Sequence, residues 1–122
     1  MDKITLHDNL AKIRQVMDSV ATIDSPESVL NKLNELQNII GLSSECMAWA
    51  SKLYEEKVAE YYISRDIVKK PSAMENKIIA NGHAKDEGML LNYANGINKD
   101  VHYQINSLVT MLSYLKEELK KL

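Results

Sequence analysis

The C-terminal third of the chain carries a long pattern of apolar residues at helical spacing. The residues are Leu90, Ala94, Ile97, Val101, Ile105, Leu108, Leu112, Leu115, Leu119 and Leu122, separated by 4, 3, 4, 4, 3, 4, 3, 4 and 3 positions. This alternation keeps apolar side chains on one face of a helix, as in a coiled coil, and the extra position near Val101 shifts the phase. A seam of this length needs a partner helix of comparable length, which favours an all-α fold.

The middle of the chain supplies a helix long enough to be that partner. Ser43-Ser44-Glu45 has the composition of a helix start, and no breaker follows before Pro71, so we predict a helix over 44–70. Ser72 and Glu75 form a capping-box pattern, which predicts that another helix begins at Ala73. Asn81-Gly82 and Gly88 are the points where this segment, 73–122, is expected to break.

The first 41 residues predict a helical hairpin, 5–41. Apolar residues at three-and-four spacing indicate a first helix over about 5–21. Pro26 occupies the position favoured at the first turn of a second helix, and Gly41 is the residue type that commonly ends one. The sequence therefore predicts one all-α domain, 1–122. It is a helical bundle with an N-terminal hairpin and long coiled-coil-like helices.

Charge and composition narrow the classes of partner. Lys and Arg number 15 against 17 Asp and Glu, a net charge of -2, which does not suit a binder of duplex DNA. No apolar run reaches the roughly 18 residues of a membrane span, and the first residues lack the pattern of a signal peptide. A single cysteine fits a reducing compartment, so we expect a cytoplasmic protein.

No group of residues has the spacing of a catalytic or metal site. His7, His83 and His102 are isolated, and His83 with Glu87, one turn apart, is more typical of a surface pair than of metal ligands. Cys46 falls in the first turn of a predicted helix, where a thiol can be reactive, but burial as a small apolar residue is the favoured interpretation. We predict no enzyme activity, metal or cofactor.

A second face of the C-terminal helix carries aromatic residues. Tyr103 and Tyr114 are eleven residues apart, almost three turns, and lie away from the leucine seam. Val109 and Met111 widen the apolar surface. These four residues are predicted to form an interface with a second copy or a protein partner, and packing against the first two helices is an equally open alternative.

Two polar groups complete the candidate sites. A candidate basic patch surrounds the predicted turn at Pro71, although solvated helix ends explain its cations more simply: Arg65, Lys69, Lys70 and Lys77. A candidate ligand segment is rich in asparagine: Asn92, Asn95 and Asn98.

The stretch from Ala48 to Leu122 resembles small helical proteins encoded in the early regions of phages and prophages. The similarity lies in a Tyr-containing helix, a capped helix and a terminal block that runs from Asn106-Ser107-Leu108 through Ser113-Tyr114-Leu115-Lys116-Glu117-Glu118. It covers about three fifths of the chain and leaves out the N-terminal hairpin. The resemblance implies an accessory role in a phage, with no catalytic residues to transfer.

The expected function is therefore that of a non-enzymatic protein that binds a host, replication or defence protein and forms a homo-oligomer. One alternative is an oligomer that sequesters a small ligand or nucleotide between subunits around the asparagine segment. Another is an accessory of single-strand DNA recombination that uses the basic patch and nearby tyrosines. A small molecule bound to the purified protein would favour the first alternative. Salt-dependent retention on DNA would favour the second.

Overall fold

The computed structural model describes residues 1–19, 25–64 and 72–121, and helices make up 94% of them. There are four helices within these ranges: α1 (Lys3–Asp18), α2 (Pro26–Ser64), α3 (Ala73–His83) and α4 (Lys85–Lys120). No strand occurs in the same ranges. The predicted all-α class is thereby confirmed. None of the described helices is long and apolar enough to cross a membrane.

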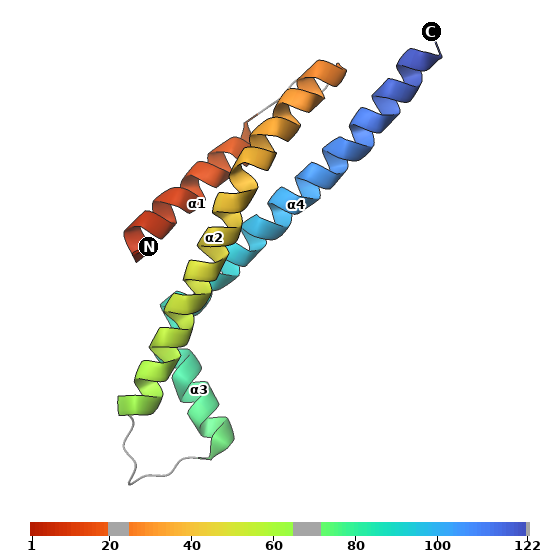
Figure 1. Cartoon of the computed structure of the whole chain (residues 1–122). Coiled ribbons are helices and arrows are strands. Elements are labelled where there is room, and N and C mark those ends of the chain that lie inside the picture. Colours follow the sequence, from red (N-terminus) through yellow and green to blue (C-terminus); the bar gives the residue numbers. More distant parts are fainter. Residues whose placement is uncertain (20–24, 65–71, 122) are drawn as a thin grey trace.

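Two long helices, α2 and α4, run antiparallel and form the body of the molecule (Figure 1). At 1.5 Å per residue, the 39 residues of α2 extend about 58 Å and the 36 residues of α4 about 54 Å. The 16 residues of α1 extend only about 24 Å, so α1 covers less than half of the pair. At the other end α3 packs against the C-terminal part of α2.

The prediction that a helix ends at Gly41 and another begins near Ser44 is wrong, because α2 continues through both residues. Glycine disfavours a helix interior by only about 1 kcal/mol, and the apolar residues on both sides of Gly41 outweigh this cost by packing against α1 and α4. The predicted hairpin 5–41 is thus α1 with the first part of a longer helix. Residues 65–70, the last part of the predicted helix 44–70, lie outside the described residues.

The start of α3 agrees with the prediction, whereas the ends of α1 and the break after α3 are displaced by two or three residues. The α1 helix begins at Lys3, where the Asp2 side chain accepts a hydrogen bond from the Thr5 amide, and it ends at Asp18 rather than near 21. Before α3, the Ser72 hydroxyl accepts a hydrogen bond from the Glu75 amide at 3.1 Å, as the capping box predicts. The break expected near Gly82 falls at Ala84, which separates α3 from α4.

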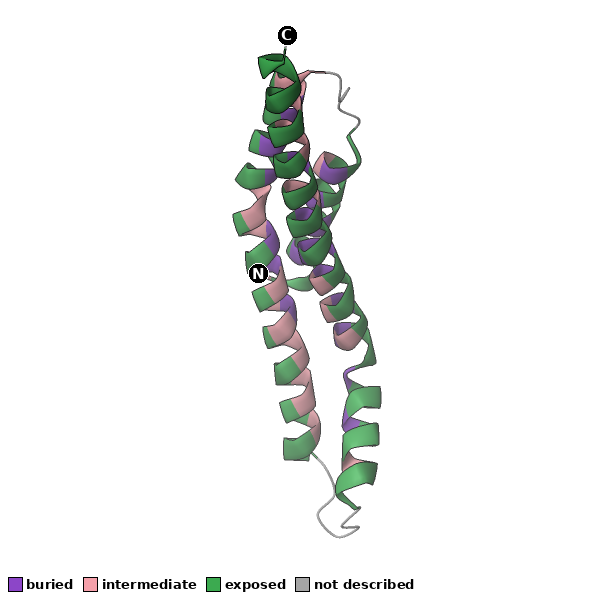
Figure 2. Cartoon of the chain, turned by 90° about the vertical axis from the view of Figure 1, so that its right-hand side faces the viewer, coloured by how far each residue is buried: buried purple, intermediate pink, exposed green. Residues whose placement is uncertain are grey.

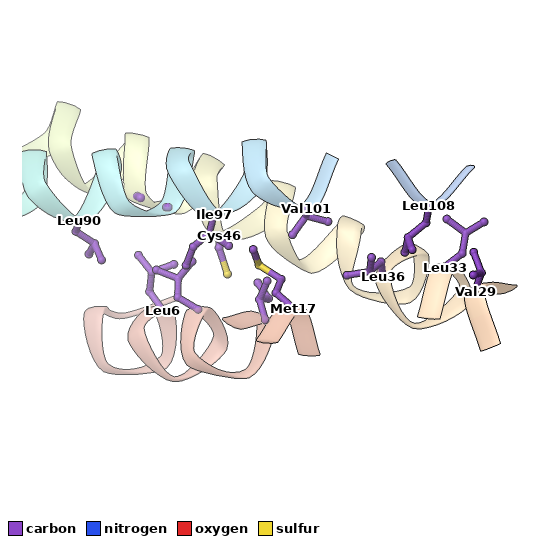
Figure 3. Close-up of a cluster of buried hydrophobic side chains, with 14 residues drawn as sticks. Leu6, Met17, Val29, Leu33, Leu36, Cys46, Leu90, Ile97, Val101 and Leu108 are labelled. Carbon is purple, nitrogen blue, oxygen red and sulfur yellow. The ribbon is translucent and has the colours of Figure 1, made fainter. Parts of the chain in front are cut away.

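The core lies between α1, α2 and α4. Figure 3 shows its two parts: Leu6 and Met17 of α1 lie over Cys46 and Ile97, whereas Leu36 and Leu33 of α2 face Leu108 beyond the end of α1. In the seam of α4, Leu90, Ala94, Ile97, Val101 and Leu108 are buried. The end of the molecule that holds α3 is mostly exposed, as the burial colours of Figure 2 show.

Candidate interaction surfaces

One side of α4, about 100° around the helix from the buried seam, carries a second row of heptad-spaced residues, all of them exposed. We call this row the tyrosine face; it consists of Met89, Tyr93, Gly96, Asp100, Tyr103, Ser107, Thr110 and Tyr114. Of its large side chains, Tyr103 is 73% exposed, Met89 and Tyr114 62%, and Tyr93 46%. Four of its eight positions carry large exposed side chains, so this face is a candidate for contact with another helix.

The four residues predicted as an interface do not share one surface. Tyr103 and Tyr114 both lie on the tyrosine face, as their eleven-residue spacing requires. Val109 is 45% exposed, but it projects about 120° or more away from either tyrosine around the helix. Met111 is half-buried and packs against the core. The alternative that both tyrosines pack against the first two helices is wrong, since they are exposed.

A groove adjoins the tyrosine face where the first turns of α1 and α4 meet. It has a volume of about 430 Å³ and is lined by Lys3, His7, Asp86, Met89, Leu90 and Tyr93. At the edge of the groove, the Lys3 ammonium donates a hydrogen bond to Glu87, with Nζ 2.5 Å from Oε1. This hydrogen bond lowers the pKa of Glu87, against the opposing effect of burial. The groove is thus an apolar depression with polar groups at its rim, and sequence reasoning missed it.

A second exposed surface lies where only α2 and α3 pair. Two hydrogen bonds join these helices, from the Tyr54 hydroxyl to Asn81 Oδ1 at 2.9 Å and from the Tyr61 hydroxyl to Asn76 Oδ1 at 3.0 Å. Five large apolar or aromatic side chains of these two helices are exposed near this end: Tyr62, Ile63, Met74, Ile78 and Ile79. Two of them, Met74 and Ile78, define what we call the tip surface. Met74 and Ile78 are one turn apart on α3, so they share one side of that helix.

The candidate basic patch is only partly placed by the structure. Lys77 is exposed on α3. Arg65, Lys69 and Lys70 lie outside the described residues.

The asparagine segment does not form a common surface. Asn92 is exposed, Asn95 is half-buried, and Asn98 is buried against α2. The Ser43 hydroxyl donates a hydrogen bond of 3.0 Å to Asn98 Oδ1, and the Asn98 amide approaches the Met47 sulfur at 3.7 Å. The prediction that Asn98 binds a ligand is therefore wrong for this subunit, because its polar atoms contact Ser43 and Met47 and so join α2 to α4.

The reactive side chains take structural positions. Cys46 is fully buried in the core, and the loss of solvation raises the pKa of its thiol. His83 lies 3.7 Å from Glu60 of α2, and Glu87 pairs with Lys3, so the predicted His83–Glu87 pair does not form. Among the described residues, no three His, Cys, Asp or Glu side chains gather as metal ligands would.

Comparisons with known proteins give no relatives: no family model, curated protein or solved structure matches the chain.

Proposed function

We propose that this chain is a non-enzymatic interaction protein that forms a homodimer along the tyrosine face of α4. The observation that carries the proposal is the tyrosine face itself, eight heptad-spaced positions that are all exposed. Large apolar and aromatic side chains that are exposed along one side of a helix mark a candidate contact surface. Tyrosine suits such an interface because its ring contributes apolar area and its hydroxyl tolerates water when the protein is monomeric.

The exposed area is sufficient for a stable contact. If a fully exposed aromatic side chain presents about 200 Å², the exposed fractions of Tyr93, Tyr103 and Tyr114 correspond to roughly 360 Å² in each copy. Two copies would contribute about twice this area from the tyrosines alone. Met89 and the smaller residues of the face bring the total to about 1,000 Å² or more, where specific interfaces begin.

The tip surface is separate from the tyrosine face and is the candidate contact for a different protein. Met74 and Ile78 present a short apolar surface on one side of α3, and an amphipathic helix of the partner is the occupant we propose for it. A host, replication or defence protein of a phage system remains the predicted source of that helix. The sequestering alternative has less support, because Asn98 is buried within one subunit.

Light scattering tests the dimer directly. At about 100 µM, a concentration that saturates a dimer of micromolar Kd, the expected mass is twice the 13.8 kDa of one chain. Replacing Tyr103 and Tyr114 together with Lys should return the monomer mass and leave the helical circular dichroism intact. The matched control, Gln37→Lys with Asn38→Lys, adds the same charge at two exposed positions of α2 and should remain dimeric. A monomer mass for the unaltered protein would refute the proposal.

A further inference from the structure

The groove between α1 and α4 opens onto the tyrosine face, because Met89 and Tyr93 belong to both. We propose that this groove receives Tyr114 of a second copy, in a dimer whose two α4 helices run antiparallel. The inference rests on the proposed self-association and adds the orientation, the register and the occupant of the groove. The occupant is therefore another copy of this chain.

The spacing of the tyrosine face fixes the register. From Met89 to Tyr114 the steps are 4, 3, 4, 3, 4, 3 and 4, which read the same in both directions. An antiparallel copy therefore brings the eight positions together in layers, with a-type positions meeting d-type positions as in antiparallel coiled coils. The layers are Met89 with Tyr114, Tyr93 with Thr110, Gly96 with Ser107, and Asp100 with Tyr103, each occurring twice by symmetry.

Side-chain size in these layers favours close contact. Gly96 meets Ser107, and a Cβ added to Gly96 would have nothing within 4 Å in one subunit, so space for a neighbouring helix is present there. Tyr93 meets the smaller Thr110. Tyr114 meets Met89 beside the groove, whose volume of about 430 Å³ exceeds that of a tyrosine side chain. Thioether sulfur beside an aromatic ring is a favourable contact.

Charge within the tyrosine face distinguishes the antiparallel from the parallel arrangement. Like charges meet at Asp86 and Glu117 in either arrangement, so the comparison depends on Asp100. In a parallel dimer of the same face, Asp100 would lie opposite Asp100 of the second copy, and two like charges at a seam repel. In the antiparallel dimer, Asp100 meets Tyr103 of the second copy, whose hydroxyl can donate to the carboxylate. The macrodipoles of the two helices are also opposed only in the antiparallel arrangement, which is the favourable one.

The rim of the groove suits the hydroxyl of Tyr114. Asp86 and His7 are exposed there, and Lys3 is half-exposed beside its partner Glu87. A tyrosine hydroxyl is both a donor and an acceptor, so it can use these groups while its ring contacts Met89 and Leu90. The apolar floor and polar rim therefore match the two ends of the side chain.

Cysteine cross-linking tests the orientation. In a Cys46→Ala background, one protein carries Asp86→Cys and another Glu117→Cys, two exposed positions that continue the seam and lie opposite each other in this register. In the mixed dimer the substitutions remove both facing carboxylates at the contact that carries the cysteines, whereas Asp86 and Glu117 still face each other at the other end. Within one kind of protein, the equivalent cysteines of the antiparallel dimer are about 46 Å apart. We expect a disulfide-linked dimer from the mixture and none from either protein alone.

The other outcomes separate the two proposals. Cross-linking of each protein alone would indicate a parallel dimer, and a dimer that does not cross-link in the mixture would have another register. Either result overturns this inference and leaves the self-association standing. A monomer in light scattering overturns both.

A double-mutant cycle tests the contact in the groove. Tyr114→Ala should raise the Kd of the dimer by about tenfold or more, because it empties the groove at each end of the interface of its aromatic side chain. Tyr114→Ala combined with Met89→Ala should raise the Kd by less than the product of the separate effects. In the control pair, Tyr103→Ala with Met89→Ala, the effects on the Kd should multiply, because the two residues belong to different layers and do not contact each other. Multiplicative effects for Tyr114 and Met89 would overturn the assignment.

Discussion

Lys3 and Glu87 join the first turn of α1 to the first turn of α4, with Nζ and Oε1 only 2.5 Å apart across 84 residues of sequence. The Glu87 side chain is 6% exposed and the Lys3 side chain 48%. A buried carboxylate needs a cation or hydrogen-bond donors, and Lys3 supplies one. The pair therefore holds the beginning of α1 against α4, where the groove lies.

Replacing Lys3 with Met should lower the free energy of unfolding at pH 7 by about 1–2 kcal/mol, a value reduced for the exposure of Lys3. The Glu87 pKa is held below its unfolded value of about 4.3, so this stabilisation is present above that pH and is lost as pH falls through the folded pKa. Urea unfolding should show that the free energy of unfolding decreases less between pH 7 and pH 3 for Lys3→Met than for the unaltered protein. Lys3→Arg should behave as the unaltered protein does. An equal decrease with pH in the unaltered protein, Lys3→Met and Lys3→Arg would contradict the role of the pair.

A buried lysine, Lys32 of α2, caps the C-terminal end of α1. Its Nζ donates to the Val16 carbonyl, to the Ser19 carbonyl at 2.9 Å and to the Ser19 hydroxyl at 2.6 Å. Carbonyls at a helix end have no partner within the helix and carry its negative pole. Lys32→Met should therefore destabilise the protein by about 1–3 kcal/mol in chemical denaturation. Lys12→Met, at an exposed position of α1, should change stability by less than about 0.5 kcal/mol. A similar effect of both substitutions would argue against this cap.

The hydrogen bond between Ser43 and Asn98 predicts coupling between α2 and α4. Asn98→Ala should lower the free energy of unfolding by about 1–3 kcal/mol, because it leaves the buried Ser43 hydroxyl without its acceptor. The double variant with Ser43→Ala should lose less than the sum of the single losses, by about 1 kcal/mol, when measured at one protein concentration. Asn92→Ala, at an exposed position on α4, is the control and should be nearly neutral. Additive losses at Ser43 and Asn98 would contradict the coupling.

Local signals in the sequence predicted much of the fold. The capping pattern of Ser72 and the proline at the start of α2 act through neighbouring backbone groups, so they can be recognised from the sequence alone. The seam of α4 can be recognised in the same way, because its apolar residues recur with the period of a helix. Leu119 is nevertheless 55% exposed, since that end of the seam has little of the bundle opposite it.

The polar contacts between helices could not be predicted in this way. Lys3 and Lys32 have the pattern of ordinary surface lysines, and only the tertiary arrangement brings Glu87 and the end of α1 to them. Asn98 was predicted as a ligand residue for the same reason, because periodicity does not reveal that Ser43 lies opposite. The tyrosine face was predicted in part, through Tyr103 and Tyr114. The groove beside it depends on where α1 lies, which no local signal indicates.

Gly41 offers a direct test of the continuous α2 helix. It is exposed in the helix interior, and an added Cβ would meet nothing within 4 Å. Gly41→Ala should therefore stabilise the protein by about 0.5–1 kcal/mol, because alanine loses less backbone entropy on entering a helix. Gly41→Asn should stabilise it less than alanine does, following helix propensity. If a helix ended at Gly41 in the left-handed conformation, the order would reverse, with glycine best, asparagine next and alanine worst. Urea midpoints of the three proteins, compared at one concentration, decide between the two orders.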